Sequence, residues 1–426
     1  MKGMKAIAFF LVVLALLAPA AAKPQFEWEK VFGSKKHDET ITSIHQTLDG
    51  GYLIAGTKGN WSKDLYIAKL DENGEVQWEK TIDFDDADIP YAILQTPDGG
   101  CLISVEVRDN SLWPGLGHII KLDPEGNVQW DKRFGEYMGD IIHSIQQTDD
   151  GGYIIAGRVS WDRYVAKLDQ EGNILWERAF ESKSMSSKAL YSIQQTSDGG
   201  YIAAGEKEYD FYVVKFDRDG NIEWEKTYGG EYTDCARAIQ QTSGGYIVAG
   251  WSMSFSNGGK DIYVMKLDKD GTLLWDMFYG KSLSDEEAHS ILQTPDGGYI
   301  VLGRRIGTPS HTILMKLDKD GNILWKGILE SEYGKPLVYA MEPTDDGGLI
   351  LAGRVVVSYG DDSDFYIVKL SLEPKLTLTP SSKPTKTGNE PTTQTGTPTL
   401  EKTESTPGFE VLPALLGLAL VLRRSR

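Results

Sequence analysis

Aromatic side chains recur in the polar, variable segments of this chain, where no repeated pattern explains them. They are Trp61, Trp113, Trp161, Trp251, Phe255 and Tyr359. Acidic residues such as Asp38 and Glu39 cluster in other polar, variable segments. Flat rings that stack and carboxylates that accept hydrogen bonds suit a sugar ring. The pattern favours a glycan-binding surface; the alternative is that the rings cover loop cores and the acids keep the surface soluble.

Five acidic residues share one position, just before the first strand of a repeated unit. They are Glu39, Asp88, Asp140, Asp234 and Glu286. If that strand lies innermost in a ring, their carboxylates surround the mouth of a channel and can hold a cation, with calcium as the candidate. In the alternative, each carboxylate caps a strand by accepting hydrogen bonds from backbone N–H groups of the next unit. The sequence leaves both interpretations open.

The common catalytic motifs are missing from the sequence. It contains no GxSxG, HExxH or P-loop, and no GxGxxG between a strand and a helix. His143 and His289 share a repeat position but lie three repeats apart, too far to share a metal. Cys101 and Cys235 lie at different repeat positions without CxxC spacing, which predicts two buried thiols. We therefore expect no catalytic residues and no cofactor apart from calcium.

The charge balance excludes one class of partner. The chain has 44 Lys and Arg against 62 Asp and Glu, a net charge of −18. Nucleic acid is bound through Lys and Arg on its phosphates, and anionic membrane surfaces attract basic segments. We expect neither, whereas cations and basic partners remain compatible with this charge.

One unit of about 50 residues is repeated seven times. Thr-x-Asp-Gly-Gly or a close variant recurs, with its Asp position at Asp49, Asp98, Asp150, Asp198, Ser243, Asp296 and Asp346. A tryptophan recurs in step at Trp28, Trp78, Trp130, Trp176, Trp224, Trp275 and Trp325. A period in this range is typical of propellers and solenoids.

Each unit divides into four short strands, which we name A to D. In the first unit they are residues 41–47, 52–56, 64–70 and 76–81, separated by a Gly-Gly turn, a polar loop and the turn Asp71-Glu72-Asn73-Gly74. The recurring tryptophan lies in strand D, where we expect it to pack between neighbouring units.

The phase of the repeats predicts a closed ring. Residues 26–32 are a strand D with no A, B or C before it, and residues 365–370 are a strand C with no D after it. Seven complete blades result only if the first strand completes the last blade, which also leaves no open sheet edge. The fold class is therefore an all-β, seven-bladed β-propeller of four-stranded blades.

In a propeller disc, the A–B and C–D turns lie on one face and the B–C and D–A loops lie on the other. The A–B and C–D turns are short and nearly constant, whereas the B–C and D–A loops vary in length and chemistry. Both variable sets are expected on one face, which we call the loop face. Variable loops on a rigid scaffold are the usual place for binding.

The repeat string QTxDGGYIIAG…DxYVxKLDxxGNIxW resembles those of secreted archaeal and bacterial propellers of unassigned role, over residues 26–370. Leu168 to Trp176 resembles the repeat of pyrroloquinoline-quinone-type propellers, whose dehydrogenases typically have eight blades and often adjacent cysteines, unlike this chain. The double glycine is similar to kelch, although here it precedes the apolar strand. The resemblance implies a fold and little about function.

The two ends resemble targeting signals. Residues 1–22 have Lys2 and Lys5, an apolar run and Ala20-Ala21-Ala22, as in a signal peptide. Residues 374–407 are rich in Thr, Pro and Ser, which predicts a disordered stalk. Residues 408–426, with the preceding proline, resemble the archaeal PGF-CTERM sorting signal, which implies an archaeosortase-type processing enzyme as a partner and attachment to a surface lipid. A simple C-terminal anchor helix is the alternative, although 12 apolar residues are short for one.

Together these features predict that residues 23–373 form a propeller outside the cell, secreted and anchored at its outer surface, with membrane contact only through the C-terminal anchor. The expected function is non-enzymatic binding of a glycan or a surface-layer protein by the loop face. A passive structural component of the surface layer and an extracellular enzyme acting on polysaccharide through a pair of acids are the alternatives.

Overall fold

The computed structural model describes residues 23–372 apart from 35–36, 61, 85–86, 109–114, 136–138, 181–188, 257–258, 281–283 and 357–361. The predicted signal peptide (1–22), stalk (374–407) and C-terminal signal (408–426) lie outside the described residues. Within the described ranges, no helix is long and apolar enough to span a membrane.

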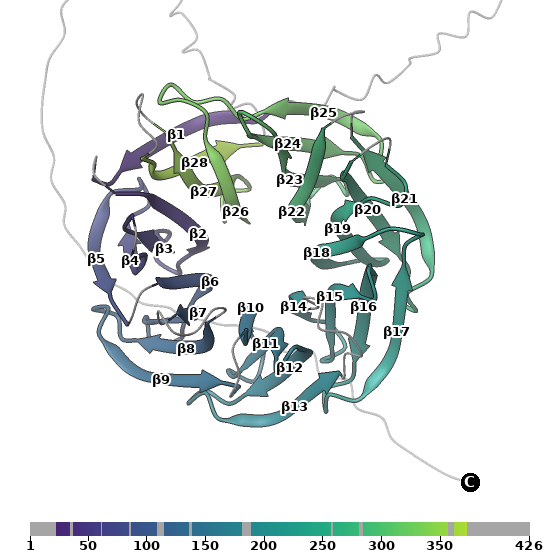
Figure 1. Ribbon diagram of the computed structural model, residues 1–426, viewed down its shortest axis with the longest axis horizontal. Coiled ribbons are helices and arrows are strands. Elements are labelled where there is room, and N and C mark those ends of the chain that lie inside the picture. The colour runs from purple at the N-terminus through teal and green to yellow at the C-terminus, as the bar shows by residue number, and fades with distance from the viewer. Residues whose placement is uncertain are drawn as a thin grey trace, which may run out of the picture. The chain divides into compact units, whose positions relative to one another are not determined.

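The described chain forms 28 strands in seven antiparallel sheets of four, which surround one axis (Figure 1). From strand A to strand D, the blades are: blade 1, β2 (Glu39–Gln46), β3 (Tyr52–Lys58), β4 (Asp64–Leu70) and β5 (Val76–Ile82); blade 2, β6 (Ala87–Gln95), β7 (Cys101–Arg108), β8 (Leu116–Leu122) and β9 (Val128–Phe134); blade 3, β10 (Ile141–Gln147), β11 (Tyr153–Val159), β12 (Asp162–Leu168) and β13 (Ile174–Phe180); blade 4, β14 (Leu190–Gln195), β15 (Tyr201–Lys207), β16 (Asp210–Phe216) and β17 (Ile222–Tyr228); blade 5, β18 (Asp234–Thr242), β19 (Gly245–Ser252), β20 (Asp261–Leu267) and β21 (Leu273–Tyr279); blade 6, β22 (Asp285–Gln293), β23 (Tyr299–Ile306), β24 (His311–Leu317) and β25 (Ile323–Ile328); blade 7, β26 (Leu337–Pro343), β27 (Leu349–Val355), β28 (Asp364–Ser371) and β1 (Gln25–Phe32). This confirms the predicted seven-bladed β-propeller, with strand A innermost (Figure 1).

The first and last strands close the ring. β1 pairs antiparallel with β28, so that Phe26 lies opposite Leu370 and Phe32 opposite Phe365. The predicted closure between residues 26–32 and 365–370 is therefore confirmed. The pairing supplies the outer strand that blade 7 would otherwise lack.

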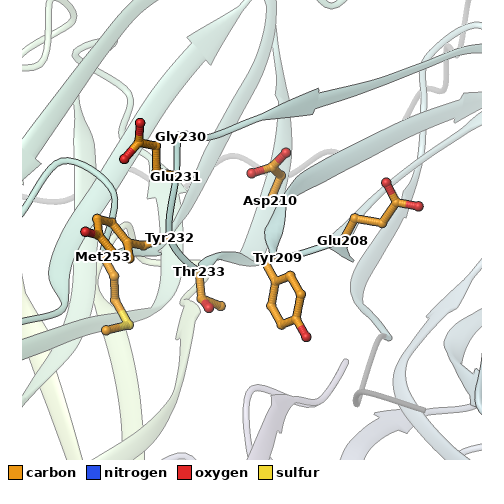
Figure 2. Close-up of a pocket in the computed structure, with 8 residues that line it drawn as sticks. All are labelled: Glu208, Tyr209, Asp210, Gly230, Glu231, Tyr232, Thr233 and Met253. Atoms are coloured by element: carbon orange, nitrogen blue, oxygen red, sulfur yellow. The ribbon is translucent and has the colours of Figure 1, made fainter. Parts of the chain in front are cut away.

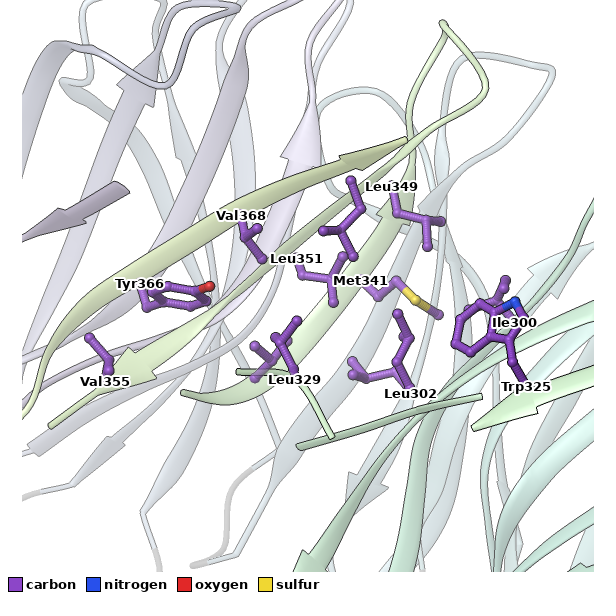
Figure 3. Close-up of a cluster of buried hydrophobic side chains, with 13 residues drawn as sticks. Ile300, Leu302, Trp325, Leu329, Met341, Leu349, Leu351, Val355, Tyr366 and Val368 are labelled. Carbon is purple, nitrogen blue, oxygen red and sulfur yellow. The ribbon is translucent and has the colours of Figure 1, made fainter. Parts of the chain in front are cut away.

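The core lies between the blades. Each of seven hydrophobic clusters combines side chains from two neighbouring sheets. Figure 3 shows the cluster in which Leu302 and Trp325 of blade 6 face Met341 and Leu351 of blade 7. A blade therefore buries both faces only when it has a neighbour on each side.

The strand D tryptophans pack across these interfaces, as predicted. Trp28 of blade 7 meets Tyr52 of blade 1 with ring centroids 6.0 Å apart. The C–D turn of blade 1 covers the same indole at Gly74, whose φ is +77°. A Cβ on Gly74 would lie 2.8 Å from the Trp28 ring. Glycine is thus required there both for backbone conformation and for space.

At the ring closure, one strand D tryptophan lacks a C–D turn packed against it. Blade 7 has no C–D turn, because its strand D comes from the other end of the chain, and Trp325 of blade 6 is left beside a groove of about 230 Å³. The groove is lined by Lys23, Pro24, Phe26 and Leu370 among others, and the Trp325 Nε1 has no partner within the described residues. The groove is a direct consequence of closure with an N-terminal strand.

In six of the seven blades, a lysine on strand C pairs with the aspartate of the A–B turn. In blade 3, Lys167 donates to Asp150 at 2.9 Å and to the Leu168 carbonyl at 3.0 Å, while the Thr148 hydroxyl donates to Asp150 at 2.6 Å. Five other lysines pair in the same way with the Asp of their turn: Lys69, Lys121, Lys215, Lys316 and Lys369. The spacing of Thr, Asp and Lys that recurs between the repeats therefore serves to hold the A–B turn.

Blade 5 departs from this arrangement. Its turn is one residue shorter, with Thr242 paired directly to Gly245, and Ser243 stands where the sequence pattern expects the aspartate. Within the described part of the chain, Lys266 donates to the Thr242 hydroxyl and to no carboxylate. Burial lowers the pKa of Lys266 to about 8, since no carboxylate of the turn offsets it.

The two cysteines are buried, unpaired and separate, as predicted. Burial raises the pKa of both thiols to about 12, so each remains protonated at neutral pH.

We predict that Asp150→Asn destabilises the fold by about 1–3 kcal/mol, because the buried Lys167 loses its counter-charge. Partial burial alone would raise the pKa of Asp150, but hydrogen bonds from Thr148 and Lys167 lower it to about 2. The contribution is present above the ordinary value of 3.8 and is lost as the pH falls towards 2. Urea unfolding at pH 7 and pH 3 measures both effects. The matched control is Asp149→Asn, and equal midpoints for the two variants would refute the role of the pair.

We also predict that an aspartate inserted between Ser243 and Gly244, which recreates the longer turn, stabilises the protein at pH 7 by about 1–2 kcal/mol. Between pH 8 and the ordinary lysine value of 10.5, the unfolded chain holds a proton that folded Lys266 has lost, so stability rises with pH in the wild type. The insertion should flatten that rise in urea unfolding across this range. An unchanged slope would show that Lys266 is not the titrating group.

Candidate functional site

The variable loops of neighbouring blades are joined on one face. At four junctions, the N–H of the first or second residue of strand A donates to a carbonyl in the B–C loop of the preceding blade. The donors and acceptors are Glu39 and Ser363 at 2.8 Å, Asp88 and Lys63 at 2.7 Å, Asp234 and Tyr209 at 2.5 Å, and Glu286 and Lys260 at 2.6 Å. The B–C and D–A loops therefore build a common loop face, as expected.

The predicted aromatic residues separate into three groups. Trp61, Trp113 and Tyr359 lie outside the described residues. Trp161 and Phe255 are exposed on B–C loops, with 37% and 46% of their surface accessible.

Trp251 corrects the expectation that its side chain belongs to an exposed loop. It lies inside β19 and is only 7% exposed, because strand B continues for two residues past the glycine at which the apolar run in the sequence ends. Thr57 takes the same position inside β3.

Two B–C loops are reduced to two-residue turns in a strained conformation. Ser160 and Trp161 in blade 3 have φ of 53° and 68°, and Glu208 and Tyr209 in blade 4 have φ of 53° and 75°. Positive φ is uncommon outside glycine and costs about 1 kcal/mol or more per bulky residue. Strain of this kind gathers at functional sites, and here it displays one aromatic ring on each of two adjacent blades.

A pocket of about 340 Å³ lies beside the second of these turns. Its lining comes from the B–C loops of blades 4 and 5 and from the D–A loop between them: Glu208, Tyr209, Asp210, Gly230, Glu231, Tyr232, Thr233 and Met253. Figure 2 shows the carboxylates of Glu208, Asp210 and Glu231 on one side of these loops and the Tyr209 ring on the other. Tyr209 and Tyr232 are 51% and 61% exposed, so their faces are available to a ligand.

Carboxylates repel one another at this pocket. Burial, followed by the charges of Asp234 and Glu208, raises the pKa of Asp210. Asp210 and Asp234 approach the same point, since a Cβ on Gly229 would lie 2.3 Å and 2.6 Å from their oxygens. The pocket therefore carries negative charge beside its two tyrosines. Sequence analysis found the aromatic and acidic character of this face but missed these tyrosines, because their exposure depends on the loop geometry.

The five acids predicted to surround the channel mouth are all buried, with 0–1% exposure. Glu39 accepts hydrogen bonds from the Ser34 N–H, Asp88 from Phe84, Asp140 from Ser160, and Asp234 from Gly230; Glu286 accepts one from the Ser284 hydroxyl. This geometry favours the capping interpretation, although the N–H groups belong to adjoining loops and not to the next blade. Within the described ranges, no three His, Cys, Asp or Glu residues are grouped closely enough to hold a metal ion. Calcium binding stays a prediction.

The comparisons with known proteins agree on the fold. A family model described as a domain of unknown function (DUF5122) β-propeller matches residues 241–273. A protein of unknown function from Dyadobacter fermentans is 11% identical, with a TM-score of 0.50, over 84% of this chain and all (100%) of that one. Sqt1 from Chaetomium thermophilum is 10% identical, with a TM-score of 0.50, over 79% of this chain and 97% of that one. No curated protein matches the chain significantly. The chain is thus a β-propeller repeat protein, and similarity at this level shows the fold alone.

We predict that replacing Glu208-Tyr209 with Asn-Gly, which favours positive φ, raises the free energy of unfolding by about 1 kcal/mol or more. The same exchange at Glu72-Asn73, in a C–D turn with negative φ before Gly74, should bring no gain. Thermal unfolding of both variants gives the comparison. A lower midpoint for the first variant would show that the tyrosine turn is not strained.

Proposed function

We propose that this protein is a binding module that holds a saccharide on its loop face, at the pocket between blades 4 and 5. The observation that carries the proposal is the strained turn that displays Tyr209 beside this pocket. Tyr209 is 51% exposed, so the hydrophobic core does not need its ring there. Selection for ligand contact accounts for a conformation that lowers stability.

The chemistry of the pocket supports a sugar. The tyrosine faces provide stacking surfaces for the C–H groups of a ring, and the carboxylates of Glu208, Asp210 and Glu231 accept hydrogen bonds from its hydroxyls. Because those carboxylates are negative, the pocket favours neutral or amino sugars over uronic acids.

A binding role also fits the face better than a passive role in a surface layer. A structural component would present a featureless loop face, whereas this one has a pocket bordered by exposed aromatic side chains. The resemblance of the two ends to targeting signals supports export and anchoring at the outer cell surface, so the ligand we propose is a glycan of the cell envelope or its surroundings.

We expect the purified chain to bind neutral or amino glycans on a glycan array and in calorimetry. Tyr209→Ala and Tyr232→Ala should each weaken binding at least about tenfold, or 1.4 kcal/mol. Tyr333→Ala, an exposed tyrosine on another D–A loop, is the matched control and should bind normally.

Runs with and without calcium test the buried acids, and an assay for released reducing ends tests the polysaccharide-acting alternative. Failure to bind any glycan in either condition would reject the proposal, and loss of binding in the control variant would move the site elsewhere.

A further inference from the structure

Strand A has a β-bulge at the same position in every blade. The pairing with strand B slips by one residue, for example between Ile41 and Ser43 and between Ile142 and Ser144. The seven bulged residues are Thr42, Tyr91, His143, Tyr191, Arg237, His289 and Tyr339. A bulge redirects one side chain and often does so beside a site.

The identity of the bulged residue is not dictated by the fold. The residue before it is always apolar and the residue after it is always Ser or Ala, as in Ala236 and Ala238. The bulged position itself varies among Thr, Tyr, His and Arg. Because strand A is innermost (Figure 1), this variable ring lies on the inner wall of the propeller, where the side chains are half-buried.

Four of these side chains form a continuous chain of contacts from blade 2 to blade 5. The His143 ring lies 4.9 Å from the Tyr91 ring at 89° and 4.9 Å from the Tyr191 ring. The Arg237 guanidinium lies 4.1 Å from the centre of Tyr191. Burial, and then the charges of Arg237 and Arg158, lowers the pKa of His143 to about 3. The imidazole is neutral at physiological pH, and the positive charge of this wall comes from the arginines.

Two of these guanidinium groups have no carboxylate partner in the described part of the chain. Arg237 stacks on Tyr191, and Arg158 donates through Nε to the Gly139 carbonyl at 2.8 Å while facing Trp161 at 5.0 Å. Neither forms a salt bridge within the described ranges, in contrast to Arg108, which pairs with Glu106 at 2.8 Å. Burial lowers the pKa of Arg237, but Cys235, Tyr191 and the more distant charges of Glu287 and Glu206 raise it.

Three buried side-chain nitrogens without hydrogen-bond partners in the described ranges lie on the adjoining wall of blades 5 and 6. Trp251 Nε1, His289 Nε2 and Arg304 Nε have no hydrogen-bond partner within the described residues. The Trp251 indole and the Arg304 Nε only donate, and a buried donor needs an acceptor. The Lys260 ammonium lies 3.9 Å from the Trp251 ring. The Glu287 carboxylate pairs with Lys260 at 2.6 Å and with Nη2 of Arg304 at 3.9 Å, which leaves Arg304 Nε free to donate.

We propose that the inner wall of blades 3 to 6 binds a small organic carboxylate, held by the Arg237 guanidinium and stacked against Tyr191. A guanidinium matches a planar carboxylate through two parallel hydrogen bonds, and the unpaired donors of blades 5 and 6 supply further ones. The site is separate from the saccharide pocket, whose carboxylates would repel the same ligand.

Calorimetry on the full chain tests this with three probes: benzoate, glucuronate and inorganic phosphate. We expect at least one carboxylate to bind saturably, and Arg237→Gln to weaken that binding by at least about tenfold. Arg218→Gln, an exposed arginine in a C–D turn, is the control and should bind normally. Tyr209→Ala should bind the carboxylate normally too, so the failure of one site is distinguishable from the failure of the other.

Thermal unfolding without ligand shows whether Arg237→Gln is folded; if it is not, Arg304→Gln replaces it with the same expected loss. Undiminished carboxylate binding by the folded variant would overturn the proposal. Binding of phosphate alone, or of no probe in the millimolar range, would overturn it as well.

Discussion

Each blade of this propeller can bury its two apolar faces only against two neighbours, so the seven sheets are stable together only as a closed ring. The pairing of β1 with β28 supplies that closure, because it gives blade 7 its outer strand and seats blade 7 between blades 6 and 1. Two of the seven inter-blade clusters, those on either side of blade 7, are formed with its residues. The closure also leaves a groove beside Trp325, since this tryptophan lacks the C–D turn that covers every equivalent indole.

Closure determines which positions in the repeat are free to vary. The strand D tryptophan and the C–D glycine fit one another across the interface, and the buried lysine of strand C holds the A–B turn through its aspartate. These positions are committed to the fold. The B–C loops, the D–A loops and the strand A bulge remain, and both proposed sites are built from those three places.

The two proposed sites have opposite electrostatic character. The loop pocket is acidic and bordered by Tyr209 and Tyr232, whereas the inner wall carries guanidinium groups in a chain whose net charge is −18. Arg158 bonds the D–A loop at Gly139 and faces the strained turn at Trp161. The two proposed sites use different parts of the repeat, so one ring can present both chemistries.

The sequence by itself determined the seven blades, the closing strand, the shared loop face and the inter-blade tryptophans, because each depends on periodicity and on turn residues with local conformational demands. It identified Trp161 and Phe255 as exposed rings but placed Trp251 in a loop, since the continuation of strand B past its glycine is not visible in the apolar run of the repeat. The burial of the acids at Glu39 and Asp234, the strained turn at Tyr209 and the bulged ring through His143 were decided only by the tertiary structure. Each depends on which backbone groups meet between neighbouring strands and blades, and on how much space is left there, and neither quantity is written in the spacing of residues along the chain.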